Sequence, residues 1–241
     1  MSGHSKWSTI KRKKEKTDAQ RAKVFTKIGR EIAVVVREGG PDPASNFRLR
    51  DIIAKAKANN VPGENIERII KKSAGGGDGS QYEDITYEGY GACGVAVIVE
   101  TLTDNRNRTA ADLRHYFDKF GGNLGQPGSV TFMFSRRGIL VLEKEGLDED
   151  KVMEDALEAG AIDLIAYDDV FEIVTEQSDF SAVRQDLADK GYHFVSAEVA
   201  YVPATTTVVT DPEAMKKIDR LFELLEENDD VQNVWHNLQE E

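Results

Sequence analysis

The residues of this chain that could do chemistry are concentrated in its first sixteen positions. Six Lys and Arg residues there face a single acid, Glu15, and no apolar periodicity organises them. Trp7 and the small polar residues from Gly3 to Ser5 are interleaved with the charges. Cations that neutralise phosphates release condensed counterions, and an aromatic ring can stack on a base. We therefore predict a mobile arm that contacts nucleic acid through Lys6, Trp7, Lys11, Arg12, Lys13, Lys14 and Lys16.

Charge is distributed unevenly along the 241 residues. The whole chain has a formal charge of -12, which by itself argues against nucleic acid. Residues 1–77, however, hold 18 Lys and Arg against 8 Asp and Glu, a net of +10, whereas residues 78–241 hold 13 against 35, a net of -22. Surface lysines are usually only solvated, but an asymmetry of this size indicates a basic binding module joined to an acidic body.

Three amphipathic helices are predicted to follow the arm. The first begins at Thr17 and Gln20, which have the spacing of a capping box, and ends at Gly39-Gly40-Pro41. The second covers about 46–59, and a short third helix follows the break at Val61-Pro62-Gly63. Short turns between helices of this kind predict a small bundle. The residues expected to face inward are Phe25, Ile28, Ile32, Val35, Val36, Phe47, Ile52, Ile53, Ala56, Ile66, Ile69 and Ile70.

Basic residues fall on the other faces of these helices, including Arg48, Lys55 and Lys57 on the second. A helix-turn-helix that reads bases is one interpretation, because the break at 60–63 has about the right length. The third helix is short and starts with the acid Glu64, which disfavours entry into a major groove. We therefore favour contact with phosphates, and the candidates on the first and third helices are Arg21, Lys23, Lys27, Arg30, Arg68, Lys71 and Lys72.

A second candidate for backbone contact is the segment from Thr103 to Thr109, which closes a strand and opens a helix. Arg106 and Arg108 at a helix N-terminus could hold a phosphate. The structural alternative is favoured, in which Asp104 or Asn107 caps the helix and Arg106 pairs with a neighbouring acid.

No pattern in the sequence predicts catalysis. The four histidines share no metal-ligand spacing, and there is neither a nucleophile elbow nor a phosphate-binding loop. The single cysteine, Cys93, is interpreted as a small buried residue beside an apolar strand rather than as a reactive thiol. The carboxylates of 145–190 are expected on solvated helix faces. We predict that the protein is not an enzyme and takes no metal, cofactor or small-molecule substrate.

The rest of the chain predicts an α+β fold. Strands are expected at about 82–88, 94–102, 129–135, 137–143, 163–168, 170–175, 195–202, 205–209 and 231–236, and helices at 108–120, 149–159, 179–189 and 212–227. Residues 137–202 follow the ferredoxin-like order, and so do residues 94–135 when they are joined to 205–236. We predict an N-terminal three-helix bundle and two ferredoxin-like modules, the second inserted in the first.

The corresponding domains are a basic helical domain of residues 1–77, an α+β domain of residues 78–135 plus 204–241, and an inserted α+β domain of residues 136–203. The glycine-rich segment Gly75–Ser80 is the expected flexible linker and domain boundary. No apolar run is long enough for a membrane span and no secretory signal stands at the start, so we expect a cytoplasmic protein with no membrane partner.

Several motifs resemble those of the YebC-type family, and the resemblance covers essentially the whole chain. They lie at Met1–Trp7, Asp18–Lys27, Asn65–Arg68, Gly94–Ala96, Thr103–Thr109, Gly121–Gly125 and Gly128–Val130. The resemblance implies a helical N-terminal domain followed by two α+β domains. It also implies a regulator of gene expression, because bacterial members are described as probable transcriptional regulators and mitochondrial members as translational activators of cytochrome c oxidase. Some bacterial members are implicated in relieving ribosomes stalled on proline-rich stretches.

Three functions are compatible with these observations. The first is a ribosome-associated translation factor that contacts ribosomal RNA, and we favour it slightly because no convincing base-reading helix is present and an acidic body would resist lying along DNA. The second is a DNA-binding transcriptional regulator. The third is an adaptor that binds proteins through its acidic modules.

Overall fold

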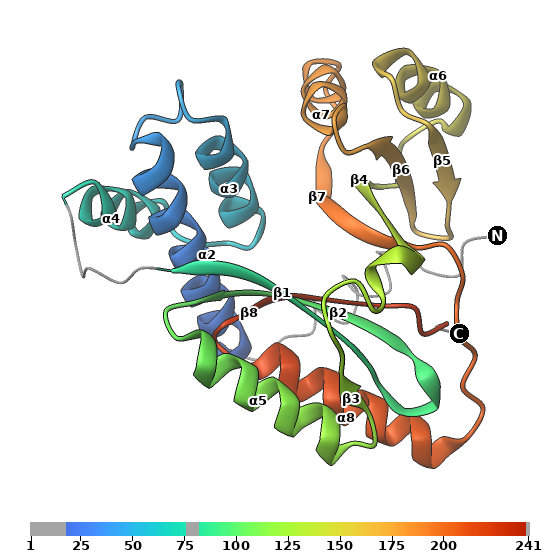
Figure 1. The fold of residues 1–241 in the computed structure, drawn as a ribbon. Coiled ribbons are helices and arrows are strands. Elements are labelled where there is room, and N and C mark those ends of the chain that lie inside the picture. Colours follow the sequence, from blue (N-terminus) through green and yellow to red (C-terminus); the bar gives the residue numbers. More distant parts are fainter. Residues whose placement is uncertain (1–17, 76–81, 240–241) are drawn as a thin grey trace. The chain divides into compact units, whose positions relative to one another are not determined.

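The computed structural model describes residues 18–75 and 82–239 of the chain (Figure 1). The described residues form two compact units: one is Met133–Thr206, and the other joins the residues up to Phe132 with Thr207–Leu238. Among the described helices, none is both long enough and apolar enough to cross a membrane.

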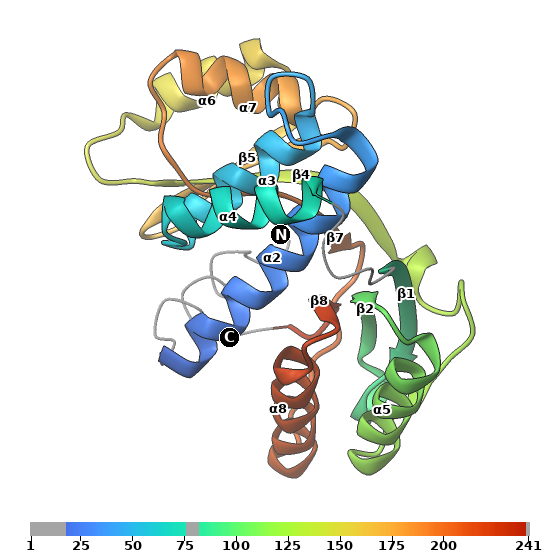
Figure 2. The ribbon, with the colours of Figure 1, turned by 90° about the vertical axis from the view of Figure 1, so that its left-hand side faces the viewer.

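The helical region has its own apolar core. It consists of α2 (Asp18–Gly39), α3 (Phe47–Ala58) and α4 (Gly63–Ala74), which confirms the three predicted helices (Figures 1 and 2). Asn46 caps α3 by accepting a hydrogen bond from the backbone N–H of Leu49. The predicted capping box at Thr17 lies outside the described residues. The buried core residues are Ile28, Ile32, Val35, Val36, Leu49, Ala56, Val61 and Ile66.

The prediction that Phe47 faces inward is wrong, because its residue surface is 69% exposed. At 100° per residue, Leu49, Ile52, Ile53 and Ala56 share one side of α3, and Phe47 falls well outside that arc. The apolar character of Phe47 predicts a core position, but its angle around the axis of α3 places it on the exposed side.

The first α+β module is a four-stranded antiparallel sheet in the order β3-β1-β2-β8. Its strands are β1 (Glu83–Tyr90), β2 (Ala96–Thr103), β3 (Asn123–Leu124) and β8 (Val231–His236). The helices α5 (Arg106–Lys119) and α8 (Pro212–Glu227) cover one face of it (Figures 1 and 2). Buried residues of both helices pack with alternate residues of β2, among them Leu113, Phe117, Ile218 and Val97.

Two predicted strands of this module are wrong. The segment 205–209 forms no strand and makes one isolated bridge, between Thr207 and Leu238. In the ferredoxin-like order predicted for this module, the segment 205–209 would pair with the strand 94–102, which is β2 in the structure. That position is occupied by β1, which pairs with both β2 and β3. The sheet order is thus ferredoxin-like, but β1 comes first in the chain rather than between the two helices.

The segment 129–135 is the second wrong strand, and Glu88 is the reason. The buried Glu88 carboxylate accepts hydrogen bonds from the backbone N–H groups of Gly128, Val130 and Thr131, at 2.6, 2.8 and 2.8 Å. Those donors are therefore not available to a neighbouring strand. Thr131–Met133 forms a turn of 3-10 helix instead, and the two-residue β3 supplies the edge strand.

The inserted module follows the predicted ferredoxin-like order. It contains β4 (Phe134–Glu143), α6 (Glu149–Ala159), β5 (Asp163–Ala166), β6 (Val170–Glu176), α7 (Phe180–Asp189) and β7 (Phe194–Pro203). The antiparallel sheet has the order β5-β6-β4-β7, and Leu140, Ile173, Val152 and Val183 lie in the core between it and the two helices. The predicted fold class, a helical bundle followed by two α+β modules of which the second is inserted in the first, is confirmed.

The interpretation of Cys93 as buried is wrong. This residue is exposed and lies in η1 (Ala92–Gly94), the turn between β1 and β2, with φ of 56°. Cys93 belongs to this turn and not to β2, so the apolar pattern of the strand that follows does not apply to it.

Candidate nucleic-acid interface

A row of cations lies on α4. Arg68, Lys71 and Lys72 are exposed, while Ile66 on the same helix is buried and Ile69 and Ile70 are partly buried against the bundle core. Residues three and four positions apart are neighbours on a helix surface, so the three cations share one face. Arg68 donates a hydrogen bond to the side chain of Asn65 at 2.9 Å. The structure brings these three predicted contacts together in a position accessible to a phosphate backbone.

The cations predicted on α2 lie elsewhere. Lys23 and Lys27 donate hydrogen bonds from Nζ to the backbone carbonyls of Glu227 and Glu226, at 2.9 and 2.7 Å. These carbonyls are at the C-terminus of α8, where a helix has unpaired acceptors and partial negative charge. The last turn of α8 contains no basic residue of its own. The two lysines of α2 therefore cap α8 from outside.

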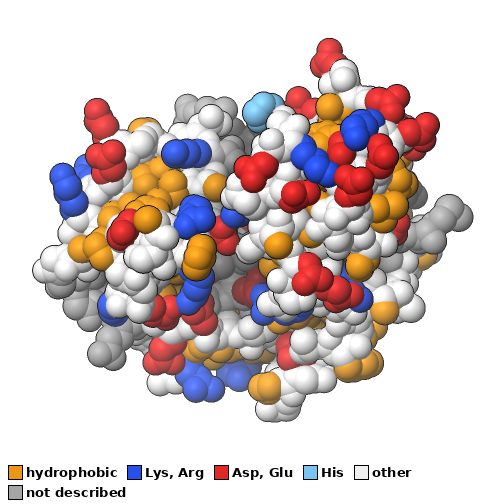
Figure 3. Space-filling model, turned by 90° about the horizontal axis from the view of Figure 1, so that it is seen from above, with side chains coloured by type: hydrophobic (Ala, Val, Ile, Leu, Met, Phe, Trp, Pro, Cys, Tyr) orange, Lys and Arg blue, Asp and Glu red, His pale blue; other side chains and the backbone are white. Residues whose placement is uncertain are grey.

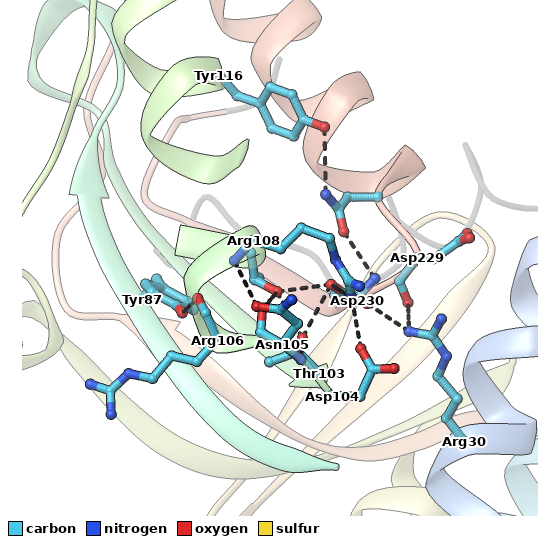
Figure 4. Close-up of polar contacts among 12 residues, drawn as sticks. Arg30, Tyr87, Thr103, Asp104, Asn105, Arg106, Arg108, Tyr116, Asp229 and Asp230 are labelled. Carbon is cyan, nitrogen blue, oxygen red and sulfur yellow. Dashed lines mark hydrogen bonds and ion pairs between the residues drawn. The ribbon is translucent and has the colours of Figure 1, made fainter. Parts of the chain in front are cut away.

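Arg30, also on α2, binds the residues just after α8, including a buried carboxylate. Its guanidinium donates to the carbonyl oxygen of Asp229 at 2.8 Å and to Oδ1 of Asp230 at 2.9 Å (Figure 4). Only 5% of the Asp230 side chain is exposed. Lys23, Lys27 and Arg30 have partners inside the protein and form a joint between α2 and the end of α8.

Asp230 is also the centre of the segment from Thr103 to Thr109. Its Oδ2 accepts hydrogen bonds from the hydroxyls of Thr103 and Thr109 at 3.2 and 2.8 Å, and from Arg108 at 2.7 Å (Figure 4). Burial tends to raise the pKa of Asp230, but hydrogen bonds from Arg108, Thr109 and Arg30 outweigh it, and its pKa is lowered. The carboxylate is therefore ionised and bound by groups from three elements: α2, the end of β2 and α5.

The structural alternative for this segment holds, with a different cap. Asn105, rather than Asp104 or Asn107, caps α5 by accepting a hydrogen bond from the backbone N–H of Arg108. Arg108 pairs with Asp104 and Asp230, so its guanidinium is engaged within the protein. Arg106 is exposed and extends away from the cluster (Figure 4), and among the described residues no ion pair to it is found. Of the two arginines, Arg106 is the one placed for an external phosphate.

The second helix of the bundle holds exposed residues that the sequence analysis did not place in the site. Arg50 and Lys57 are exposed, together with Phe47. Arg48 is exposed as well and pairs with Glu38 of α2, and Lys55 pairs with Glu31 at 2.7 Å. A helical-wheel projection centred on Leu49 and Ala56 would have separated these residues from the core.

Several predicted contacts lie outside the described residues. The backbone of Arg21 belongs to α2, but its side chain is not described. The contacts of the predicted arm are wholly outside: Lys6, Trp7, Lys11, Arg12, Lys13, Lys14 and Lys16. Within 18–75 and 82–239, there is also no cluster of three or more His, Cys, Asp or Glu residues placed to hold a metal ion.

Family models match almost the full length of the chain. The model described as the TACO1/YebC protein N-terminal domain matches residues 5–76, and the one described as the TACO1/YebC second and third domain matches residues 82–238. The chain belongs to the TACO1/YebC family. The boundary between the two matches falls in the glycine-rich segment after α4.

Two curated relatives and one solved structure are similar to this chain over nearly their whole length. A probable transcriptional regulatory protein of Acetivibrio thermocellus is 58% identical over 238 residues, with 98% of each chain covered. One of Ruminiclostridium cellulolyticum is 58% identical over 242 residues, covering 100% of this chain and 98% of the relative. The crystal structure of a conserved hypothetical protein from Aquifex aeolicus superposes with a TM-score of 0.83 at 44% identity, covering 92% of each chain.

Proposed function

We propose that this protein is a nucleic-acid-binding regulator of gene expression that acts in the cytoplasm through its helical domain, and that it is not an enzyme. The observation on which this depends is the concentration of positive charge in residues 1–77, with a net of +10 in a chain of net charge -12. The exposed row Arg68, Lys71 and Lys72 on α4 supports it. So do the names of its relatives, which are probable transcriptional regulatory proteins.

The charge of the protein surface favours a nucleic-acid target that lies next to basic proteins. Figure 3 displays Lys and Arg side chains among hydrophobic and some acidic ones over the helical domain, on the left, and many acidic side chains with some Lys and Arg over the inserted module, on the right. A long DNA duplex would repel an acidic body that lay along it, whereas a ribosomal site includes basic proteins that attract one. We therefore propose ribosomal RNA as the target and the relief of stalled translation as the role.

A DNA-binding transcriptional regulator is the second candidate, and the names of the relatives favour it. In that case α4 would be the recognition helix of a helix-turn-helix. Its twelve residues, Gly63–Ala74, follow the cap Pro62, and the first two are Gly63 and Glu64. A recognition helix contacts base edges with its N-terminal residues, and an acid there is unfavourable near phosphates. Arg68 is the residue best placed to test this reading.

Binding to ribosomes and to DNA can be compared directly. The full-length protein is mixed with ribosomes at moderate salt and sedimented, and it is also incubated with a randomised duplex DNA library. We expect co-sedimentation with ribosomes and no consensus from the library. A sharp consensus that Arg68→Ala blurs, by about 1–3 kcal/mol at one base position, with no ribosome binding, would establish the transcriptional alternative instead.

A further inference from the structure

Among the described residues of the helical domain, Phe47 is the exposed large hydrophobic one. Its 69% exposure forgoes the stabilisation that burial of a phenylalanine supplies. The position is nevertheless fixed, because the buried Asn46 next to it donates from Nδ2 to the carbonyls of Val35 and Gly40, both at 2.9 Å, and accepts from Leu49. The start of α3 is thus held rigidly against α2 while the ring of Phe47 is presented to solvent.

The ring is stacked with a cation. The Arg50 guanidinium carbon lies 4.9 Å from the centroid of the Phe47 ring, and its nitrogens donate to the carbonyls of Pro43 and Ala44 at 3.3 Å. This arrangement restricts the ring and places a positive charge beside it. An immobilised ring loses less side-chain entropy when a ligand stacks on it.

Phe47 and Arg50 continue into a stripe along α3. At 100° per residue, Phe47, Arg50, Ala54 and Lys57 fall within about 80° of one another, and all four are exposed. The stripe is about 15 Å long at 1.5 Å per residue. The short side chain of Ala54 does not project from the middle of the stripe. None of the described residues pairs with the ammonium of Lys57. We call Phe47, Arg50, Ala54 and Lys57 the α3 stripe.

We propose that the α3 stripe binds an unpaired stretch of RNA, with a base stacked on the exposed ring of Phe47 and a backbone phosphate on Lys57, while Arg50 holds the ring and adds positive charge beside it. A ring next to cations suits this ligand, because every base has a π-face and every nucleotide a negative charge. A paired duplex keeps its bases stacked on one another and offers no face to Phe47. The inference rests on the proposed function and makes it specific, since it selects loops and single strands over helical RNA.

The test uses the full-length protein and two labelled probes, a short unpaired RNA and a blunt RNA duplex. Phe47→Ala is expected to weaken binding of the unpaired RNA about ten-fold and to leave duplex binding unchanged. Phe47→Tyr keeps the ring and should bind as the wild type does, whereas Phe47→Leu keeps only the apolar surface and should behave as Phe47→Ala. Phe132→Ala removes another exposed phenylalanine and is the matched control, expected to have no effect.

The outcomes separate this inference from the proposed function. If the wild type binds RNA and Phe47→Ala binds each probe as tightly as the wild type does, the α3 stripe is not the site, and the proposed function stands. An equal loss on both probes, or full binding by Phe47→Leu, also overturns stacking. If the wild type binds neither RNA probe, the inference fails. If it also binds neither ribosomes nor duplex DNA in the comparison described under the proposed function, the proposed function fails as well.

Discussion

Asp230 connects three parts of the chain through one carboxylate. It pairs with Arg30 of α2 and Arg108 of α5, and it accepts from Thr103 at the end of β2. A buried ionised carboxylate is favourable only when its lone pairs are satisfied. This accounts for the residue types in the segment from Thr103 to Thr109, because its two threonines and Arg108 donate hydrogen bonds to the Asp230 carboxylate.

We predict that Asp230→Asn lowers the free energy of unfolding by about 2–3 kcal/mol, since Arg30 loses its charged partner and Arg108 loses one of two. Urea denaturation followed by circular dichroism measures this. Asp104→Asn is the control, because Asp104 also pairs with Arg108 but is exposed, and its loss should cost under about 0.5 kcal/mol. Equal effects of the two substitutions would mean that burial of Asp230 contributes nothing to the ion pairs.

Glu88 should make the first α+β module sensitive to acid. Burial favours a raised pKa, but hydrogen bonds from Thr131 and from the backbone of Gly128 and Val130 lower the pKa of Glu88 below its usual value of 4.5. A carboxylate with a lowered pKa stabilises the fold above its unfolded pKa, and this contribution disappears as the pH falls through the folded pKa. The loss therefore occurs below about pH 4.5.

Glu88→Gln tests this assignment. At pH 7 the variant should be less stable than the wild type by about 2 kcal/mol, because both carboxylate oxygens of Glu88 accept backbone hydrogen bonds, whereas the amide has only one oxygen that can accept. The difference should shrink as the pH is lowered below 4.5 and through the lowered pKa of Glu88, since the wild type then loses the same contribution. A stability difference that is constant over that range would show that the charge of Glu88 is not involved.

At the scale of elements, α3 depends on its first residues. Asn46 caps the helix and bonds two carbonyls of the preceding segment, so Asn46→Ala removes three hydrogen bonds from a buried position. We predict a loss of about 2 kcal/mol, at the upper end of the effect of a cap. Asn105→Ala removes a more exposed cap, that of α5, and should cost about 1 kcal/mol in the same denaturation experiment. A smaller loss for Asn46→Ala than for Asn105→Ala would contradict the account.

Element boundaries could be predicted where the terminating chemistry is local. The helices predicted at 149–159 and 212–227 have those bounds in the structure. Asp148 caps the first of them, and Gly160 ends it with φ of 102°. Pro212 opens the second directly after its cap, Asp211. These residues act on their neighbours, so their roles can be read from a short window of sequence.

What could not be predicted depends on distant partners. The segment 129–135 alternates like a strand, but its N–H groups are bound by Glu88, 40 residues or more earlier. Lys23 and Lys27 have the spacing of a solvated basic face, but they cap a helix about 200 residues later. Within the predicted interface, α4 could therefore be placed from its pattern, whereas the position of the α2 cations required the tertiary structure.

At the scale of the whole molecule, the two charge regions have different expected roles. We propose that residues 1–77 supply the affinity for nucleic acid and that the acidic modules restrict where it can be used. Half of the +10 in residues 1–77 comes from positions 1–17, where six cations face one acid. The salt dependence of binding should reflect those cations, because each phosphate contact releases counterions.

The most direct test is the affinity of the full-length protein for ribosomes measured over a range of salt concentrations. If about six cations contact phosphates, the logarithm of the association constant should fall with the logarithm of salt with a slope of about -4 to -5. A variant in which Lys11, Arg12, Lys13 and Lys14 are replaced by Ala should remain folded, bind more weakly, and have a slope of about -1.5 to -2. A wild-type slope near zero, or one that the variant shares, would contradict binding through the basic domain.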